Sequence, residues 1–202
     1  DHAIVRGGLK QILADTSDIA VAGEAGHGQE VLEKLSETSY DVVVLDISMP
    51  GRSGLDILAQ LKREYPRTKV LILSMHPEEQ YALRALKAGA SGYLTKESVP
   101  DELIAAIRKV SAGRKYISSA LAERLAIAWE DGHEKSIHER LSDREYEIMC
   151  MIAKGKSVKE IALELSLSIK TVSTYRSRIL AKTDMKNNAE IIYYAIKNNM
   201  ID

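Results

Sequence analysis

Four polar side chains of this sequence could together carry out one kind of chemistry: Asp1, Asp46, Ser74 and Lys96. The last three each end a short apolar run, and Asp1 opens the chain. A carboxylate can attack phosphorus as a nucleophile, and a lysine and a hydroxyl would neutralise and bind the transferred oxygens. Two carboxylates brought together repel each other and need a cation between them, and an all-oxygen site suits Mg²⁺.

Each of these residues also has an ordinary structural interpretation. An Asp that ends a strand, as Asp46 would, is often a turn former or the N-cap of the next helix. Asp1 could be a cap, Ser74 a turn residue and Lys96 a solvated lysine. Their joint occurrence at successive strand ends favours a shared site over separate ordinary roles.

The elements that would position them alternate strictly between strand and helix. Residues 42–45 form an unbroken apolar run, which suits a strand buried on both faces of a parallel sheet. The same patterns predict strands over 19–22, 42–45, 70–73 and 92–95 and helices over 3–14, 29–35, 55–61, 78–88 and 101–112. Such alternation indicates a parallel sheet with helices on both faces, whose ligands bind at the carboxyl ends of the strands. We expect a first strand upstream of Asp1, at the same edge.

The motifs around these residues resemble the receiver domain of two-component response regulators. The resemblance lies in Asp46 with Met49-Pro50-Gly51 and Gly54, in Ser74 after its strand, and in Gly89-Ala90-x-Gly92-Tyr93-Leu94-x-Lys96. It covers roughly residues 1–115 and implies a flavodoxin-like fold, a doubly wound parallel sheet. It also implies that Asp46 is the phosphoacceptor, Ser74 the switch hydroxyl, Tyr93 the switch aromatic and Lys96 the phosphate-contacting lysine. The implied Mg²⁺ ligands are Asp1, Asp46 and the backbone carbonyl of Ser48.

Two other functions are alternatives to a phosphorylated switch. Haloacid-dehalogenase phosphatases also use a strand-end Asp, but they need a second Asp two residues later as general acid, and here that position is Ser48. Without the acid an acyl phosphate should persist, which suits a switch and not an enzyme. The other alternative is a DNA-binding regulator whose receiver serves in docking or dimerisation and is never phosphorylated.

The C-terminal third has the pattern of a small helical DNA-binding domain. Ser142 and Glu145 form a capping box, and helices are expected over 143–154, 158–165, 169–182 and 189–198. The region is the one basic part of a chain whose net charge is −1, and the stretch 169–182 holds four basic residues and no acidic one. A solvated basic face of an ordinary helical bundle is the alternative. Residues 116–140 are expected to be a linker with a helix, and 141–202 the second domain.

This third resembles the LuxR-type helix-turn-helix, through Ser142-x-x-Glu145, Gly155-x-Ser157-x-Lys159-x-Ile161-Ala162 and Ser168-x-Lys170-Thr171-Val172-x-Thr174-Tyr175. With a receiver in front, the chain resembles the NarL/FixJ class of response regulators. Matching positions imply a set of base-facing residues and a set of phosphate-binding residues. The first set is Ser173, Thr174 and Ser177, and the second is Lys170, Thr171, Arg176 and Lys182. Val172 and Ile179 should face the core, and the family's dimerisation helix corresponds to an apolar face that includes Ile191, Ile192 and Ala195.

These resemblances imply a transcription factor that a sensor histidine kinase phosphorylates on Asp46. Its further partners would be double-stranded DNA, in two half-sites, and a second copy of the chain. No apolar run reaches the roughly 18 residues of a membrane span, no signal peptide opens the chain, and the single cysteine excludes an internal disulfide. We therefore expect a cytoplasmic protein without a membrane partner.

Overall fold

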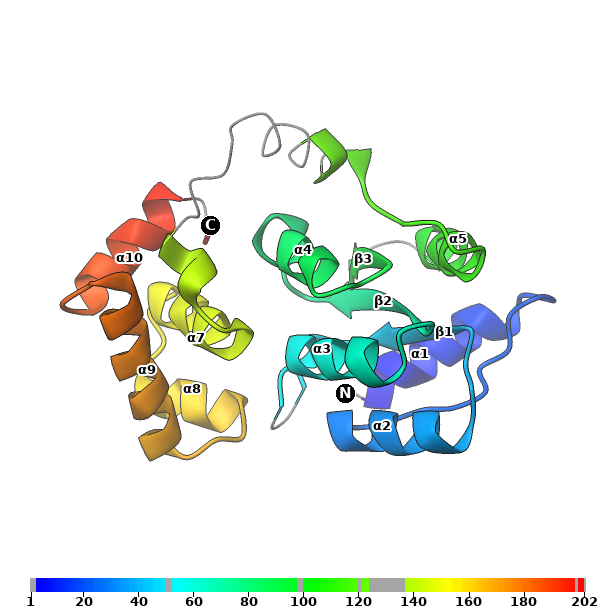
Figure 1. Ribbon diagram of the computed structural model, residues 1–202, viewed down its shortest axis with the longest axis horizontal. Helices are drawn as coiled ribbons and strands as arrows, with labels where there is room; N and C mark the ends of the chain where they lie inside the picture. Colours follow the sequence, from blue (N-terminus) through cyan, green and yellow to red (C-terminus); the bar gives the residue numbers. More distant parts are fainter. Residues whose placement is uncertain are drawn as a thin grey trace. The chain divides into compact units, whose positions relative to one another are not determined.

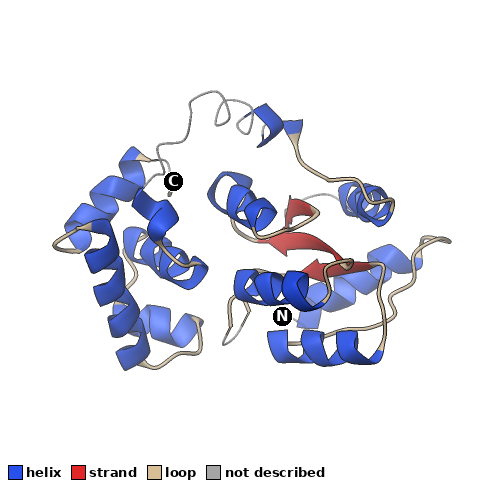
Figure 2. Cartoon of the chain, in the orientation of Figure 1, coloured by secondary structure: helices blue, strands red, loops and turns tan. Residues whose placement is uncertain are grey.

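A computed structural model describes residues 3–49, 52–97, 100–119, 121–123, 137–198 and 200–201. It divides the chain into two compact units, Asp1–Ala122 and Glu123–Asp202. The first unit alternates helices and strands, and the described part of the second contains helices without strands (Figure 2). Each unit has its own core, so each is described separately.

The first unit is built on three short parallel strands. Its elements in chain order are α1 (Ala3–Ala14), α2 (Gly28–Glu37), β1 (Val42–Leu45), α3 (Gly54–Glu64), β2 (Lys69–Ser74), α4 (Glu78–Lys87), β3 (Gly92–Thr95) and α5 (Pro100–Ser111). The strand order is β1-β2-β3, with Val44 opposite Leu71 and Leu73 opposite Leu94. The predicted doubly wound α/β architecture is therefore confirmed.

Helices cover both faces of this sheet. In Figure 1, α1 and α5 lie on one side of the strands and α3 and α4 on the other. The α1–α5 side encloses a core that includes Leu13, Leu71, Leu103 and Val110. Alternate residues of each strand point to opposite faces, so a continuous apolar strand supplies both cores at once.

One predicted strand is wrong. Residues 19–22 lie in an extended segment that pairs with no described strand, although Ile19 still packs against the α1–α5 core. A strand is stabilised by hydrogen bonds to a neighbour, and apolar β-branched residues alone do not provide one.

The second unit is a bundle of short helices. Its elements are a 3₁₀ helix η1 (Ile137–Arg140), α7 (Asp143–Ala153), α8 (Val158–Glu164), α9 (Ile169–Thr183) and α10 (Asn188–Lys197). The capping box predicted at Ser142 and Glu145 is present, and Ser157 and Glu160 form a second one at the start of α8. The expected linker helix is helical at 119 and 121–123, and the rest of it lies outside the described residues.

No helix in the described parts of the chain has the length and apolar character needed to cross a membrane. The longest, α9, has 15 residues. A span of the hydrocarbon core takes about 20 predominantly apolar residues.

Candidate functional site

The strand ends place Asp46, Ser74 and Lys96 at one edge of the sheet. Asp46 directly follows β1, Ser74 is the last residue of β2, and Lys96 directly follows β3. The Lys96 amide donates to the Ser74 carbonyl at 2.7 Å, so the pairing of β2 and β3 continues to the edge itself. Parallel strands in register therefore gather the three predicted side chains at their carboxyl ends.

Asp46 and Lys96 form an almost fully enclosed ion pair. The Lys96 ammonium donates to Asp46 Oδ2, and each side chain is only 8% exposed. Asp46 Oδ1 accepts the Ser48 amide at 3.1 Å, a local turn contact of the kind that Asp often makes. The N-cap of the next helix is Ser53 and not Asp46. Lys96 is thus a buried counter-ion, and Asp46 combines a turn bond with a charge-paired oxygen.

Ser74 and Tyr93 are both buried beside this pair. The Ser74 hydroxyl accepts the His76 amide at 3.1 Å, and the Tyr93 hydroxyl donates to the His76 carbonyl at 2.8 Å. Both contacts end on the backbone of one residue in the loop after β2. A change in the orientation of either side chain would therefore act on that loop.

His76 was not predicted from the sequence, yet it has contacts on four sides. Beyond its two backbone bonds, its Nε2 lies 3.0 Å from Ser48 Oγ, and its ring stacks on Tyr81 of α4 at 4.5 Å between centroids. No motif marks the position, because its role depends on the fold bringing the loops after β1 and β2 together.

Gly54 allows the chain to turn tightly behind Asp46. Its amide donates to the Ile47 carbonyl at 2.8 Å. A Cβ at this position would lie 1.9 Å from the Asp46 carbonyl oxygen and 2.7 Å from Ile47 Cα. The first turn of α3 therefore packs directly against the backbone that carries Asp46.

The structure describes two of the three predicted metal ligands. Asp1 lies outside the described residues, so its place is not assigned. Asp46 and Ser48 lie together at the sheet edge, and both offer oxygen, the donor type that Mg²⁺ prefers. Within the described residues no three His, Cys, Asp or Glu side chains gather into a metal site, so a cation here would also need backbone or water oxygens.

In the second unit, α9 presents one face to the core and another to solvent. Ser168 caps the helix by accepting the Thr171 amide at 3.0 Å, and Val172 and Ile179 are fully buried, as the spacing predicts. The exposed face carries short hydroxyl side chains. Thr174 and Ser177 donate to the carbonyls four residues earlier, so each keeps its acceptor lone pairs for an incoming ligand.

The basic residues of α9 differ in how free they are to meet an anion. Lys170 and Arg178 line a hollow of about 310 Å³ together with Thr171, Thr174 and Tyr175. The Arg176 side chain is half-buried, and its Nε donates to Asn188 Oδ1 at 2.7 Å.

Lys182 is paired with a carboxylate of its own domain. Its ammonium donates to Glu145 Oε2 at 2.6 Å and so ties the end of α9 to the start of α7. Arg178, which has no place in the predicted contact set, lines the hollow beside Lys170.

The apolar face of α10 is largely internal. Ile191 and Ala195 are fully buried within the unit and Ile192 is half-buried, and the dimerisation role expected for them stays a prediction. The exposed apolar side chains of this helix are Tyr193 and Ile196, at 70% and 59%. The periodicity found the helix face correctly, but that face packs inside the domain.

Comparisons with known proteins assign both units. Residues 1–108 match the family described as response regulator receiver domain, and residues 139–195 match bacterial regulatory proteins of the luxR family. Over 201 residues the chain is 38% identical to response regulator UvrY of Escherichia coli K12, covering 99% of the chain and 92% of UvrY. Over 203 residues it is 38% identical to response regulator GacA of Pseudomonas aeruginosa, covering 100% and 95%.

Solved structures agree with this assignment. RcsB of Salmonella typhimurium superimposes with a TM-score of 0.69 at 26% identity, over 98% of the chain and 94% of that protein. A second structure, of RcsB from Salmonella enterica serovar Typhimurium bound to promoter rprA with the phosphomimetic BeF₃⁻, gives 0.62 at 26% identity, over 96% and 94%.

Proposed function

The chain belongs to the two-component response regulators of the NarL/FixJ class, with a receiver followed by a LuxR-type DNA-binding domain, and from this premise we propose that phosphorylation of Asp46 controls it. The observation that carries the proposal is the enclosed Asp46–Lys96 ion pair at the carboxyl edge, with the Ser74 strand end beside it. The family consists of DNA-binding regulators and not of turnover enzymes.

The chemistry is a phosphoryl transfer from a phosphohistidine of a sensor histidine kinase. An Asp46 carboxylate oxygen attacks phosphorus, the P–N bond of the donor breaks, a P–O bond forms, and the donor imidazole recovers its neutral form by taking a proton. The product is an acyl phosphate on Asp46. Lys96, now paired with the carboxylate, offsets the charge of the added oxygens, and the Ser74 hydroxyl donates to one of them.

Mg²⁺ would supply additional positive charge at this site when bound. The fit rests on donor chemistry, since Asp46 and the backbone carbonyl of Ser48, two residues later in the same turn, would offer hard oxygens. Asp1 is the third ligand in this proposal. The chain's own contribution is to hold Asp46 between the Ser48 amide and the Lys96 ammonium, which orients the nucleophile before the donor arrives.

The output is binding of α9 to double-stranded DNA. Ser173, Thr174 and Ser177 face base edges, while Lys170, Thr171 and Arg176 contact phosphates. Arg178 joins the phosphate contacts because it lines the same hollow as Lys170. Lys182 also binds Glu145, and because an ammonium has three donors it can contact a phosphate at the same time. The RcsB–promoter structure with a phosphomimetic supports the link between receiver state and DNA binding.

A dimer on two half-sites would use the exposed part of α10. Tyr193 and Ile196 provide its apolar contact area, with Ile192 at the rim. Ile191 and Ala195 support this surface from inside.

The test of the phosphoacceptor is intact mass after treatment with acetyl phosphate and Mg²⁺. Wild type should gain one phosphate and Asp46→Asn none. A variant that is labelled to the same extent as wild type would overturn the assignment of Asp46. If neither protein is labelled, the result favours the alternative, a receiver that serves in docking or dimerisation and is not phosphorylated.

A further inference from the structure

The chain that leaves α5 remains bound to the receiver. We call residues 114–122 the strap, in which residue 120 is not described. The Tyr116 amide donates to the Ser91 carbonyl at 2.9 Å, and Tyr116 bridges Gly92 in parallel fashion at the edge of β3. The approach is so close that a Cβ on Gly92 would lie 2.7 Å from the Tyr116 carbonyl oxygen. The strap therefore extends the sheet on the side of β3.

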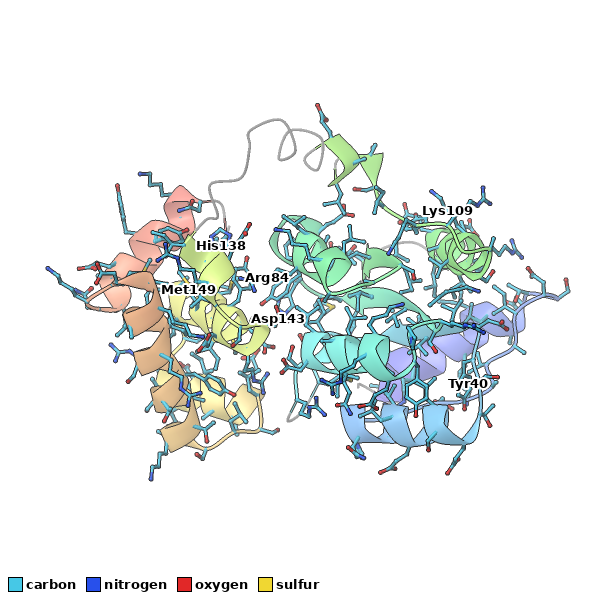
Figure 3. The ribbon with its side chains drawn as sticks, viewed as in Figure 1. Tyr40, Arg84, Lys109, His138, Asp143 and Met149 are labelled. Atoms are coloured by element: carbon cyan, nitrogen blue, oxygen red, sulfur yellow. The ribbon has the colours of Figure 1, made fainter. Side chains whose placement is uncertain are left out.

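Side chains hold the strap at further points. The Lys115 ammonium donates to the Ala90 carbonyl, and the Lys109 ammonium of α5 lies 5.5 Å from the centre of the Tyr116 ring (Figure 3 labels Lys109). Burial raises the pKa of the Tyr116 hydroxyl, and the carboxylates of Glu102 and Glu78 raise it further. The strap thus runs close to Glu78, the first residue of α4.

A hydrogen bond joins the strap to α4. The Ser118 hydroxyl donates to Glu78 Oε2 at 2.5 Å and also accepts the Leu121 amide at 3.0 Å, at the start of the helical residues 119 and 121–123. Leu121 is 4% exposed, so this turn is packed and not only tethered. The N-cap of α4 is Pro77, which makes no side-chain cap bond, and Glu78 fastens the start of this helix to the strap.

The start of α4 is also connected to the phosphoacceptor edge. Glu78 lies two residues after His76, which contacts Ser48, Ser74 and Tyr93 through its ring and its backbone. A phosphoryl group on Asp46 would give the Ser74 hydroxyl a new acceptor for its proton, and a rotation of that hydroxyl would act on the His76 amide that it now accepts. His76 and Glu78 are separated only by Pro77, so the shift reaches the Glu78 carboxylate through stiff backbone.

We propose that the Glu78–Ser118 hydrogen bond is a latch, which holds the strap on the unphosphorylated receiver and opens when Asp46 is phosphorylated. The latch rests on the proposed function, since it needs Asp46 as phosphoacceptor. Opening frees residues 116–122 from β3 and α4 and adds them to the tether of the DNA-binding domain. A longer tether widens the range of positions that this domain can take when two copies bind one DNA.

The test is hydrogen exchange of strap amides in the full chain, with and without acetyl phosphate and Mg²⁺. In wild type, phosphorylation should accelerate exchange over residues 116–122 by about tenfold, equivalent to about 1.4 kcal/mol. Glu78→Ala should show the fast rate without any donor and no further change with it. Glu102→Ala is the matched control. The Glu102 carboxylate, like that of Glu78, raises the pKa of Tyr116, but Ser118 donates to Glu78 and not to Glu102. The strap amides of Glu102→Ala should therefore exchange as in wild type.

A charge-reversal pair separates a latch from general damage to the fold. Ser118→Asp keeps a side chain that can cap the following turn but places its carboxylate beside that of Glu78. The two negative charges repel each other, so the strap amides should exchange fast. Combining Ser118→Asp with Glu78→Lys restores an attractive pair and should restore slow exchange. Failure of the double variant to recover would overturn the latch.

Intact mass on the same samples separates the two proposals. A wild-type chain that is labelled on Asp46 while its strap rates stay unchanged overturns the latch alone. A wild-type chain that is not labelled overturns the phosphoacceptor assignment, and the phosphate-driven opening with it.

Discussion

Replacing Glu145 with glutamine should loosen the DNA-binding domain by removing a charge that joins two of its helices. Glu145 Oε2 accepts the Ser142 amide at 2.8 Å and the Lys182 ammonium at 2.6 Å. The first bond completes the cap of α7 and the second holds the end of α9. Because glutamine keeps the shape and one acceptor oxygen, the substitution isolates the charge.

The size of the effect follows from the exposure of the two partners. A hydrogen bond to a charged group contributes about 1.5–3 kcal/mol. Leaving a buried charge unpaired costs about 3–5 kcal/mol, but this does not apply, because the Lys182 side chain is 44% exposed and can turn to water. Glutamine also keeps part of the cap. We therefore expect a loss of about 2 kcal/mol in the free energy of opening, or about thirtyfold in exchange rate.

The assay is hydrogen exchange of amides in α7 and α9 of the full chain at neutral pH. Glu160→Gln is the matched control, since Glu160 occupies the same place in the Ser157 capping box but is exposed to solvent. Its substitution should change exchange in α8 by no more than a few fold. Equal effects of the two substitutions, or less than threefold for Glu145→Gln, would refute the reasoning.

The same carboxylate gives this domain a pH dependence of known sign. Burial alone would raise the pKa of Glu145, but the bonds from Lys182 and Ser142 outweigh it and hold the pKa below its usual range. The stabilisation is therefore complete above the pKa of an unfolded glutamate, about 4.3, and is lost as the pH falls through the lower folded value. Glu145→Gln should remove this part of the acid sensitivity.

Three further substitutions test the packing and the DNA surface. Gly54→Ala should lower the free energy of unfolding by about 3 kcal/mol or more, because the added Cβ would overlap the Asp46 carbonyl oxygen. An unchanged thermal unfolding midpoint would contradict this. Ile191→Ala should lower the free energy of unfolding by about 2–5 kcal/mol, because it removes a core side chain. Ile196→Ala should leave the unfolding midpoint unchanged and weaken dimerisation on DNA. Thermal unfolding and sedimentation measure the two effects, and the reverse pattern would make Ile191 an interface residue. Arg176→Ala should weaken binding to all DNA sequences alike and lower the salt slope by about 1, while a loss confined to one sequence would indicate base contact.

The local sequence pattern was enough to predict a helix, strand or cap wherever that element depends mainly on its own residues. The unbroken apolar run at Val42–Leu45 and the glycine-bounded run at Gly92–Thr95 became strands with the expected bounds. Ser142 and Ser168 cap their helices as predicted, because a cap involves only the next three residues.

The pattern was insufficient where a residue's role depends on a distant partner. Residues 19–22 have strand composition but no described neighbour to pair with. The ion pair of Lys182 with Glu145, 37 positions earlier, has no signal in the local sequence, and the predicted phosphate contact of Lys182 stays a prediction. Ile191 lies on an apolar helix face, and periodicity cannot tell whether such a face meets the core or a second copy. His76 matters only because two loops meet around it.

The central claim is that the chemical state of Asp46 sets how the chain binds DNA. Its most direct measurement is the affinity of wild type and Asp46→Asn for one DNA at fixed salt, each with and without acetyl phosphate and Mg²⁺. We predict that the donor changes the affinity of wild type by at least tenfold and leaves Asp46→Asn unchanged. An equal response of both proteins, or no response of a wild type shown by mass to be phosphorylated, would contradict the account.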